Sequence, residues 1–189
     1  MSKLFAATGQ NNRRNAGKRA VDTQILLREV QTKERASERY MLSVARMNYL
    51  HSRYRTAGKI LDDDLLHTLG SNLVEIFRVI DHEEWRKLDD VEKCALGIFH
   101  KNFGDDMEIP FTSLPSSQVG WTDGLHFAQE LQSWISKYEQ AVAKPTTTND
   151  QYVRVYVDSA ASSMPKPLRI LLRKIIAFDL DKTMRESLW

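Results

Sequence analysis

The sequence is poor in cysteine and in long apolar runs. Its 189 residues include one cysteine, Cys94, which excludes an intrachain disulfide framework and any zinc site built from several cysteines. No stretch approaches the ~20 consecutive apolar residues of a spanning helix, so no transmembrane helix is predicted in this chain. Residues 1–8 are too short and too weakly apolar for a secretory signal peptide. The composition, 42% hydrophobic and 28% charged, is typical of a globular domain with its own core.

The net charge of +2 is small, but basic residues gather near both ends of the chain. Such clusters can bind anionic lipid or nucleic acid, or can be ordinary solvated surfaces. Aromatic residues do not alternate with these charges as a stacking platform for bases would require, so no nucleic-acid partner is expected. The basic residues are Lys3, Arg13, Arg14, Lys18 and Arg19 near the start, and Lys166, Arg169, Arg173, Lys174, Lys182 and Arg185 near the end.

Apolar residues recur every three or four positions along most of the chain. This periodicity predicts an all-α, single-domain helical bundle of about seven or eight helices. Residues 152–158 alternate like a strand, but a lone strand has no partner in this chain, so we interpret them as helical. The other expected helices span about residues 16–30, 33–57, 62–80, 89–104, 122–138, 168–178 and 180–188.

The whole chain, residues 1–189, is expected to form one helical domain. Residues 1–15 are predicted to be a basic N-terminal arm. Residues 144–150, which include a proline and three threonines, are predicted to be a linker before a C-terminal helical segment. The residues expected to face inward on the first helix are Val21, Ile25 and Val30.

A histidine, His51, lies within a regular apolar stripe. The stripe steps by four, three, four and three residues, so its members share one face of a helix. Two interpretations of His51 stay open: a core imidazole bonded to a neighbour, or the axial ligand of a buried haem, whose iron needs a neutral imidazole in a dry pocket. The stripe consists of Tyr40, Val44, Met47, His51 and Tyr54.

Arg19 and Thr23 are four residues apart and therefore lie one turn apart on the same helix face. They can be a surface guanidinium and a hydroxyl bonded back to its own helix. Alternatively, Arg19 can bind a carboxylate or propionate while Thr23 donates a hydrogen bond to a bound oxygen species. The remaining histidines, at positions 67, 82, 100 and 126, lie on separate segments without the spacing of a metal site.

Four segments resemble the fungal branch of the MpaB/latex-clearing rubber oxygenase family, and the similarity extends from about residue 3 to residue 189. The resemblance implies an all-helical fold and, from the rubber oxygenases, a b-type haem held through one histidine. Rubber oxygenases use dioxygen to cleave an isoprenoid carbon–carbon double bond. The fungal members are membrane-associated enzymes of secondary metabolism that act on prenylated intermediates. The segments are MNYLHSRYRTAGK (47–59), DDLLHTL (63–69), EWRKLDDVEKCALG (84–97) and WTDGL (121–125).

The resemblance also implies roles for single residues. His51 falls on the proximal haem ligand, and Arg19 and Thr23 fall on an Arg-x-x-x-Thr pair upstream of it. Arg19 would anchor a propionate or polarise the pocket, and Thr23 would bond to an oxygen atom. The residue before Thr23, a lysine that ligates iron in some rubber oxygenases, is Asp22 here. The family's upstream membrane-anchoring segment, with an acidic residue proposed as a base, is expected to be absent.

These features lead to one expected function and one alternative. The first is a haem-dependent oxygenase with a b-type haem, which uses dioxygen to oxidise or cleave an apolar substrate of prenylated or polyketide type. It would be intracellular and associated with the endoplasmic reticulum, with peripheral membrane contact through the helix at residues 168–178. The alternative is a non-catalytic helical interaction module or membrane-surface module derived from that family.

Overall fold

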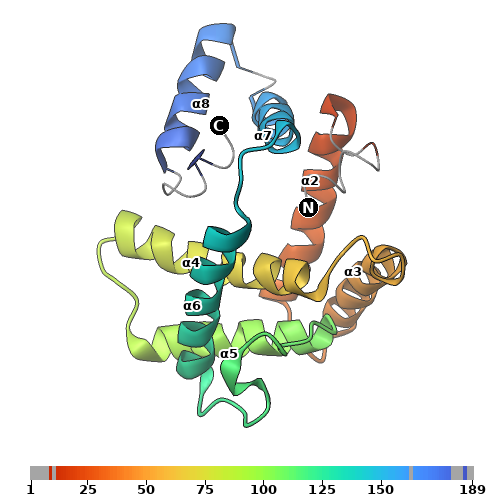
Figure 1. Ribbon diagram of the computed structural model, residues 1–189, viewed down its shortest axis with the longest axis vertical. Coiled ribbons are helices and arrows are strands. Elements are labelled where there is room, and N and C mark those ends of the chain that lie inside the picture. Colours follow the sequence, from red (N-terminus) through yellow and green to blue (C-terminus); the bar gives the residue numbers. More distant parts are fainter. Residues whose placement is uncertain (1–8, 10–11, 162–163, 180–184, 187–189) are drawn as a thin grey trace. The chain divides into compact units, whose positions relative to one another are not determined.

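The computed structural model describes residues 9, 12–161, 164–179 and 185–186 (Figure 1). Over these residues the secondary structure consists of helices without a β-strand, which confirms the all-α class. The helices in the described part are α2 (Arg13–Thr32), α3 (Glu38–Thr56), α4 (Asp62–Glu83), α5 (Asp90–Asp106), α6 (Gly124–Val142), α7 (Thr147–Ala160) and α8 (Lys166–Asp179), with a short 3-10 helix, η1 (Pro115–Ser117), before α6.

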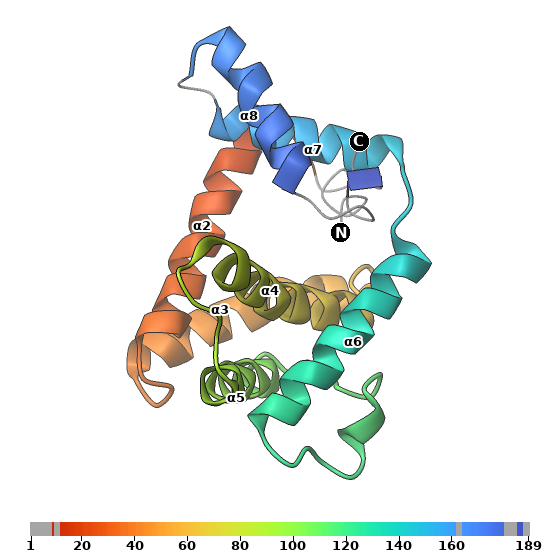
Figure 2. The ribbon, with the colours of Figure 1, turned by 90° about the vertical axis from the view of Figure 1, so that its left-hand side faces the viewer.

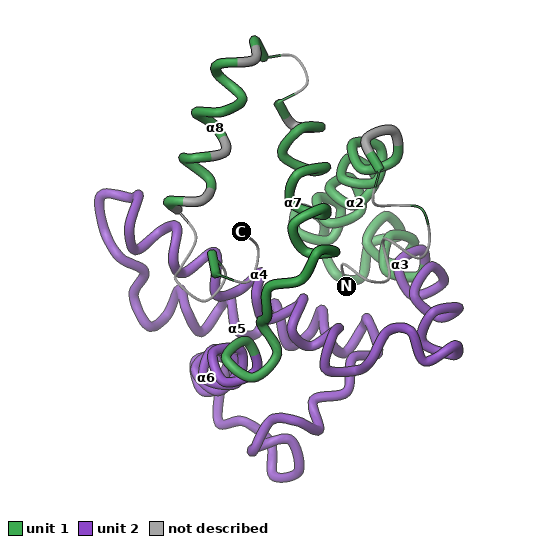
Figure 3. Tube along the Cα trace, turned by 45° about the horizontal axis from the view of Figure 1, so that its top comes forward, with its two compact units in different colours: residues 1–45, 139–189 green, residues 46–138 purple. Residues whose placement is uncertain are grey.

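The chain divides into two compact units (Figure 3). Unit 1 combines both ends of the sequence, residues 1–45 and 139–189. Unit 2 is continuous and comprises residues 46–138. Helices α3 and α6 each contribute residues to both units. A single domain over residues 1–189 stays a prediction.

In unit 1, α2 packs against α7. Gly17 lies at the contact, where an added Cβ atom would come within 2.9 Å of the Ser159 hydroxyl oxygen. Val30 is buried as predicted, but Val21 and Ile25 are 55% and 56% exposed, so their inward placement was wrong. With about 3.6 residues per turn, Val21 and Ile25 lie on the side of α2 opposite the buried Ala16 and Val30.

The helical interpretation of residues 152–158 is confirmed, because they lie within α7. Val153 and Val157, one turn apart, are both buried, so a helical repeat accounts for their alternation with polar residues. Helix α7 begins earlier than predicted, since the Thr146 hydroxyl accepts a hydrogen bond from the Asn149 amide at 3.2 Å and caps the helix. The irregular segment is therefore residues 143–146, and the second half of the predicted linker 144–150 is helical.

Both ends of the chain lie partly outside the described residues. Within the predicted arm 1–15, α2 already begins at Arg13, and residues 1–8 and 10–11 are outside the described part. Of the predicted last helix, residues 180–188, the structure describes residues 185–186. Across the described residues, no helix is long and apolar enough to cross a membrane.

In unit 2, α4 pairs with α5, and α6 crosses both of them (Figures 1 and 2). An added Cβ on Gly97 of α5 would overlap the carbonyl oxygen of Gly124, the first residue of α6. An added Cβ on Gly70 of α4 would instead meet the side chains of Leu131 and Ile135 of α6. Because Gly97 carries no side chain, α5 and α6 approach to backbone contact where they cross. The buried residues of α4 and α6 in this core include Leu65, Leu66, Leu69, Leu73, Phe77, Phe127, Ala128, Leu131 and Ile135.

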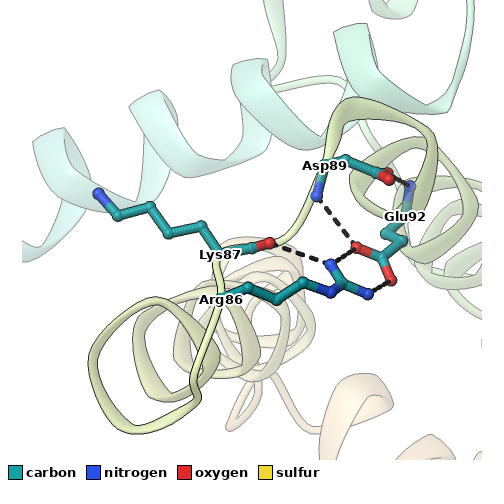
Figure 4. Close-up of polar contacts among 4 residues, drawn as sticks. All are labelled: Arg86, Lys87, Asp89 and Glu92. Carbon is teal, nitrogen blue, oxygen red and sulfur yellow. Dashed lines mark hydrogen bonds and ion pairs between the residues drawn. The ribbon is translucent and has the colours of Figure 1, made fainter.

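The predicted capping box at the start of α5 is confirmed (Figure 4). The Glu92 amide donates to the Asp89 carboxylate at 2.8 Å, and the Asp89 amide donates to the Glu92 carboxylate at 3.0 Å. Arg86 adds two hydrogen bonds to Glu92, at 2.6 and 2.7 Å. The hydrogen bonds from Arg86 and from the Asp89 amide lower the pKa of Glu92 to about 2.

Helix α3 begins five residues later than predicted, at Glu38. The Ser37 hydroxyl accepts a hydrogen bond from the Tyr40 amide at 3.3 Å, as an N-cap does. The predicted end is confirmed, because α3 stops at Thr56 and Gly58 adopts a left-handed φ of 63°. An ion pair of 3.2 Å between Arg55 and Asp62 joins the end of α3 to the start of α4.

Candidate functional site

His51 lies on the predicted stripe of α3. Tyr40, Val44 and Met47 on this stripe are buried, and His51 and Tyr54 are half-buried, so the shared inward face is confirmed. The Nδ1 atom of His51 is shielded from solvent. This part of α3 is fixed within unit 2 by a hydrogen bond of 2.9 Å from the Asn48 side chain to the carbonyl oxygen of Asp106 at the end of α5.

Arg19 and Thr23 lie on α2, in unit 1. Arg19 is half-buried, and its Nη1 donates to the Tyr156 hydroxyl on α7 at 2.5 Å. Thr23 is exposed. Asp22 pairs with Lys18 at 2.7 Å on the solvated side of the same helix. In unit 1 the guanidinium of Arg19 therefore bonds to the phenol of Tyr156, and the hydroxyl of Thr23 lies one helical turn from Arg19.

Two tyrosines that the sequence analysis did not single out complete the surroundings of Arg19. The rings of Tyr152 and Tyr156, one turn apart on α7, have centroids 4.4 Å apart. Burial raises the pKa of Tyr152 above its ordinary value of 10.0; the neighbouring Tyr156 adds to the rise, and Arg19 opposes it. Tyr152 is therefore a hydrogen-bonding phenol rather than a charged group. The spacing of four residues between the two tyrosines places them on one helix face, so the sequence could have predicted this pair.

Arg19 and Thr23 belong to unit 1, whereas His51 belongs to unit 2. The structure brings Arg19 together with Tyr156 and places Thr23 on the same helix. The assignment of His51, Arg19 and Thr23 to one site stays a prediction.

His100 is the most enclosed of the described polar side chains, with 1% of its surface exposed. Its Nδ1 lies 2.8 Å from the carbonyl oxygen of Leu96, and its Nε2 lies 3.1 Å from the Asn72 side chain. Burial lowers the pKa of His100 from 6.5, and the bond to Leu96 opposes this shift. Both ring nitrogens are engaged within the protein, so His100 is a core histidine of unit 2.

A serine, a histidine and a glutamate meet between η1 and α6 and could suggest nucleophilic catalysis. The Nε2 atom of His126 lies 3.4 Å from the Ser116 hydroxyl and 3.4 Å from Glu130. However, the Thr122 amide donates to the Nδ1 atom of His126 at 3.2 Å, which places the proton of the neutral ring on Nε2. His126 therefore cannot accept a proton from Ser116, and the group does not form a catalytic triad.

His51 is the candidate protein donor for a haem. A b-type haem takes four ligands from its porphyrin and needs one or two from the protein. His51 supplies an imidazole on a largely buried face, with Nδ1 turned away from solvent, as is usual for a metal-binding histidine whose other nitrogen coordinates. The donor chemistry of His51 therefore fits a haem. Among the described residues, no group of three or more His, Cys, Asp or Glu side chains could hold a bare metal ion.

Comparisons with known proteins found three curated relatives. The chain is 35% identical over all its 189 residues to the ER-bound oxygenase mpaB of Penicillium roqueforti (strain FM164), and 34% identical over the same length to the ER-bound oxygenase mpaB' of Penicillium brevicompactum. It is 40% identical over 150 residues to the ER-bound oxygenase mpaB of Penicillium brevicompactum. The chain spans 63%, 45% and 38% of the lengths of these relatives. No family model and no solved structure matches it.

Proposed function

Because the chain belongs to an MpaB-like family, we propose that it is an oxygenase of secondary metabolism with a b-type haem as its cofactor. The observation that carries the proposal is the half-buried His51 on α3, within a sequence that matches relatives named oxygenases over its full length. The proposed substrates are dioxygen and an apolar molecule of prenylated or polyketide type.

In this proposal His51 holds the iron through a neutral imidazole. When bound, the haem supplies the redox chemistry that dioxygen requires. Arg19 binds a carboxylate such as a haem propionate, and Tyr156 fixes the direction of the guanidinium through its 2.5 Å hydrogen bond. Thr23 offers an exposed hydroxyl as a hydrogen-bond donor to an oxygen atom. Asp22 forms an ion pair with Lys18 on the solvated side of α2.

Reconstitution of the purified chain with hemin tests the assignment of His51. We expect a Soret band and, after dithionite reduction, a carbon monoxide difference spectrum. Both should be lost in His51→Gly and restored by added imidazole, which replaces the missing ligand. His82→Gly is the matched control, because His82 is exposed and its ring bonds to the Arg78 carbonyl of its own helix at 2.8 Å.

Two outcomes would overturn the proposal. The first is a wild-type chain with native helix content by circular dichroism that takes up no haem. The second is a Soret band in His51→Gly, without imidazole, equal to that of the wild type. Arg19→Gln should leave the Soret position unchanged and weaken haem retention, because Arg19 is proposed to bind the edge of the cofactor rather than its iron.

A further inference from the structure

Helix α8 carries a row of exposed apolar side chains. Leu168, Leu171, Ile175 and Phe178 follow one another at steps of three, four and three residues, so they share one side of the helix. All four are exposed, and Phe178 is 82% exposed. The two most extensive helix pairings among the described helices are α2 with α7 and α4 with α5, and α8 takes part in neither. The apolar side of α8 is therefore a contiguous exposed patch, the kind of surface that marks an interaction site.

The charge of α8 is strongly positive. Its sequence contains four basic residues, Lys166, Arg169, Arg173 and Lys174, and one acidic residue, Asp179. In the helical repeat of about 3.6 residues per turn, Lys174 lies beside the apolar row, one turn from Leu171, and Arg169 lies on the opposite side of the helix. Lys174 is exposed, and Arg169 bonds to the Met164 carbonyl at 2.8 Å. The helix thus combines an apolar row with basic residues outside it, and the exposed Ile170 also lies outside the row.

The length of α8 decides how it could meet a membrane. Its 14 residues extend about 21 Å along the helix axis, which is shorter than the ~30 Å hydrocarbon core of a bilayer. A helix of this length with an apolar side and basic flanks lies in the plane of the interface, with its apolar side among the acyl chains and its cations at the headgroups.

We propose that α8 is a membrane-binding helix that docks onto an anionic lipid surface. The apolar row enters the headgroup boundary, and the basic residues bind acidic headgroups. Charge complementarity favours an anionic bilayer as the partner of α8. Such a bilayer matches both the apolar side and the positive charge of the helix. A second copy of the chain would match the apolar side but bring an equally positive helix.

Vesicle co-sedimentation of the full chain at about 0.15 M salt tests the proposal. We expect at least ~10-fold stronger partitioning to phosphatidylcholine vesicles containing a quarter phosphatidylserine than to pure phosphatidylcholine. The double variant Leu171→Glu, Ile175→Glu should lower this partitioning at least ~10-fold, because it places two anions on the apolar side. Higher salt should weaken binding of the wild type.

The matched control is Val91→Glu, Val119→Glu. It also replaces two exposed apolar residues by glutamate, but both are in unit 2. Because this variant changes the net charge equally but leaves the apolar row of α8 intact, it should stay within ~2-fold of the wild type. Circular dichroism verifies that each variant retains its helix content.

Three results would overturn the assignment. They are a folded wild type that does not bind the anionic vesicles, binding that survives the α8 variant unchanged, and a lipid-independent dimer in analytical ultracentrifugation that only the α8 variant abolishes. The last would assign the apolar row to a second copy. The inference does not depend on haem, so it can fail or succeed independently of the proposed oxygenase function.

Discussion

In unit 2 the closest helix contacts involve backbone atoms, whereas in unit 1 they involve side chains. Gly97 of α5 meets the carbonyl oxygen of Gly124, while Gly17 of α2 meets the flexible end of the Ser159 side chain. Polar contacts differ as well: unit 2 encloses His100 completely, and unit 1 links α2 to α7 through the half-buried Arg19 and Tyr156. A backbone contact cannot move aside, so unit 2 should tolerate added volume much less than unit 1.

The largest expected effect comes from adding one methyl group at the glycine contacts of the two units. Gly97→Ala should lower the free energy of unfolding by about 3 kcal/mol, because the new Cβ overlaps backbone atoms of α6. Gly17→Ala should change it by less than about 1 kcal/mol, since the Ser159 side chain can rotate and alanine favours the helix. Urea denaturation followed by circular dichroism measures both. Equal losses of unfolding free energy in the two variants would contradict the expected difference between unit 1 and unit 2.

A smaller effect is expected from the buried imidazole of unit 2. His100→Gln should cost about 2 kcal/mol at pH 7.5, because it disturbs two buried hydrogen bonds. Burial lowers the pKa of His100 in the folded state, so below pH 6.5 the unfolded chain binds the extra proton first. Stability of the wild type should therefore fall as the pH drops below 6.5, and His100→Gln should show a flatter dependence.

Urea titrations between pH 5 and pH 7.5 measure that dependence. His82→Gln is the control for the same substitution at an exposed histidine. A wild-type slope that persists in His100→Gln would assign the pH dependence to other groups.

The smallest expected effect is in unit 1. Tyr156→Phe should lower the free energy of unfolding by about 1 kcal/mol, because it removes the hydroxyl that accepts from Arg19 at the edge of the α2–α7 contact. In a double-mutant cycle with Arg19→Gln, the losses should be less than additive by a similar amount. Strictly additive losses would show that the two side chains do not stabilise each other.

Local features of the fold were predictable from the sequence. The α3 stripe, the Asp89–Glu92 capping box and the helical state of residues 152–158 depend on residues three or four positions apart, so the sequence displays them directly. The same periodicity wrongly predicted that Val21 and Ile25 face inward. Two or three apolar residues on a helix do not show which side of that helix packs against its neighbour. The start of α3 was also missed, since Ser37 was not read as a cap.

Long-range contacts were not predictable in the same way. Arg19 was identified as a candidate, but its partner Tyr156 lies 137 positions away, and no local pattern connects them. His100 and Asn72 are separated by 28 positions, so the enclosed histidine looked no different from the exposed His82. For His51 the stripe correctly predicted an inward face, whereas its role as a haem ligand rests on the family resemblance and awaits the spectroscopic test.

The discontinuity of unit 1 has a consequence for synthesis on the ribosome. Unit 2 is a single run, residues 46–138, and can close its core once those residues have emerged. Helix α2 is made before these residues, and its partner α7 is made after them. Ala16 of α2 and Val157 of α7 can therefore become buried only after α7 has been made. During translation the nascent chain therefore carries an early helix without its partner until residues 147–160 have been made.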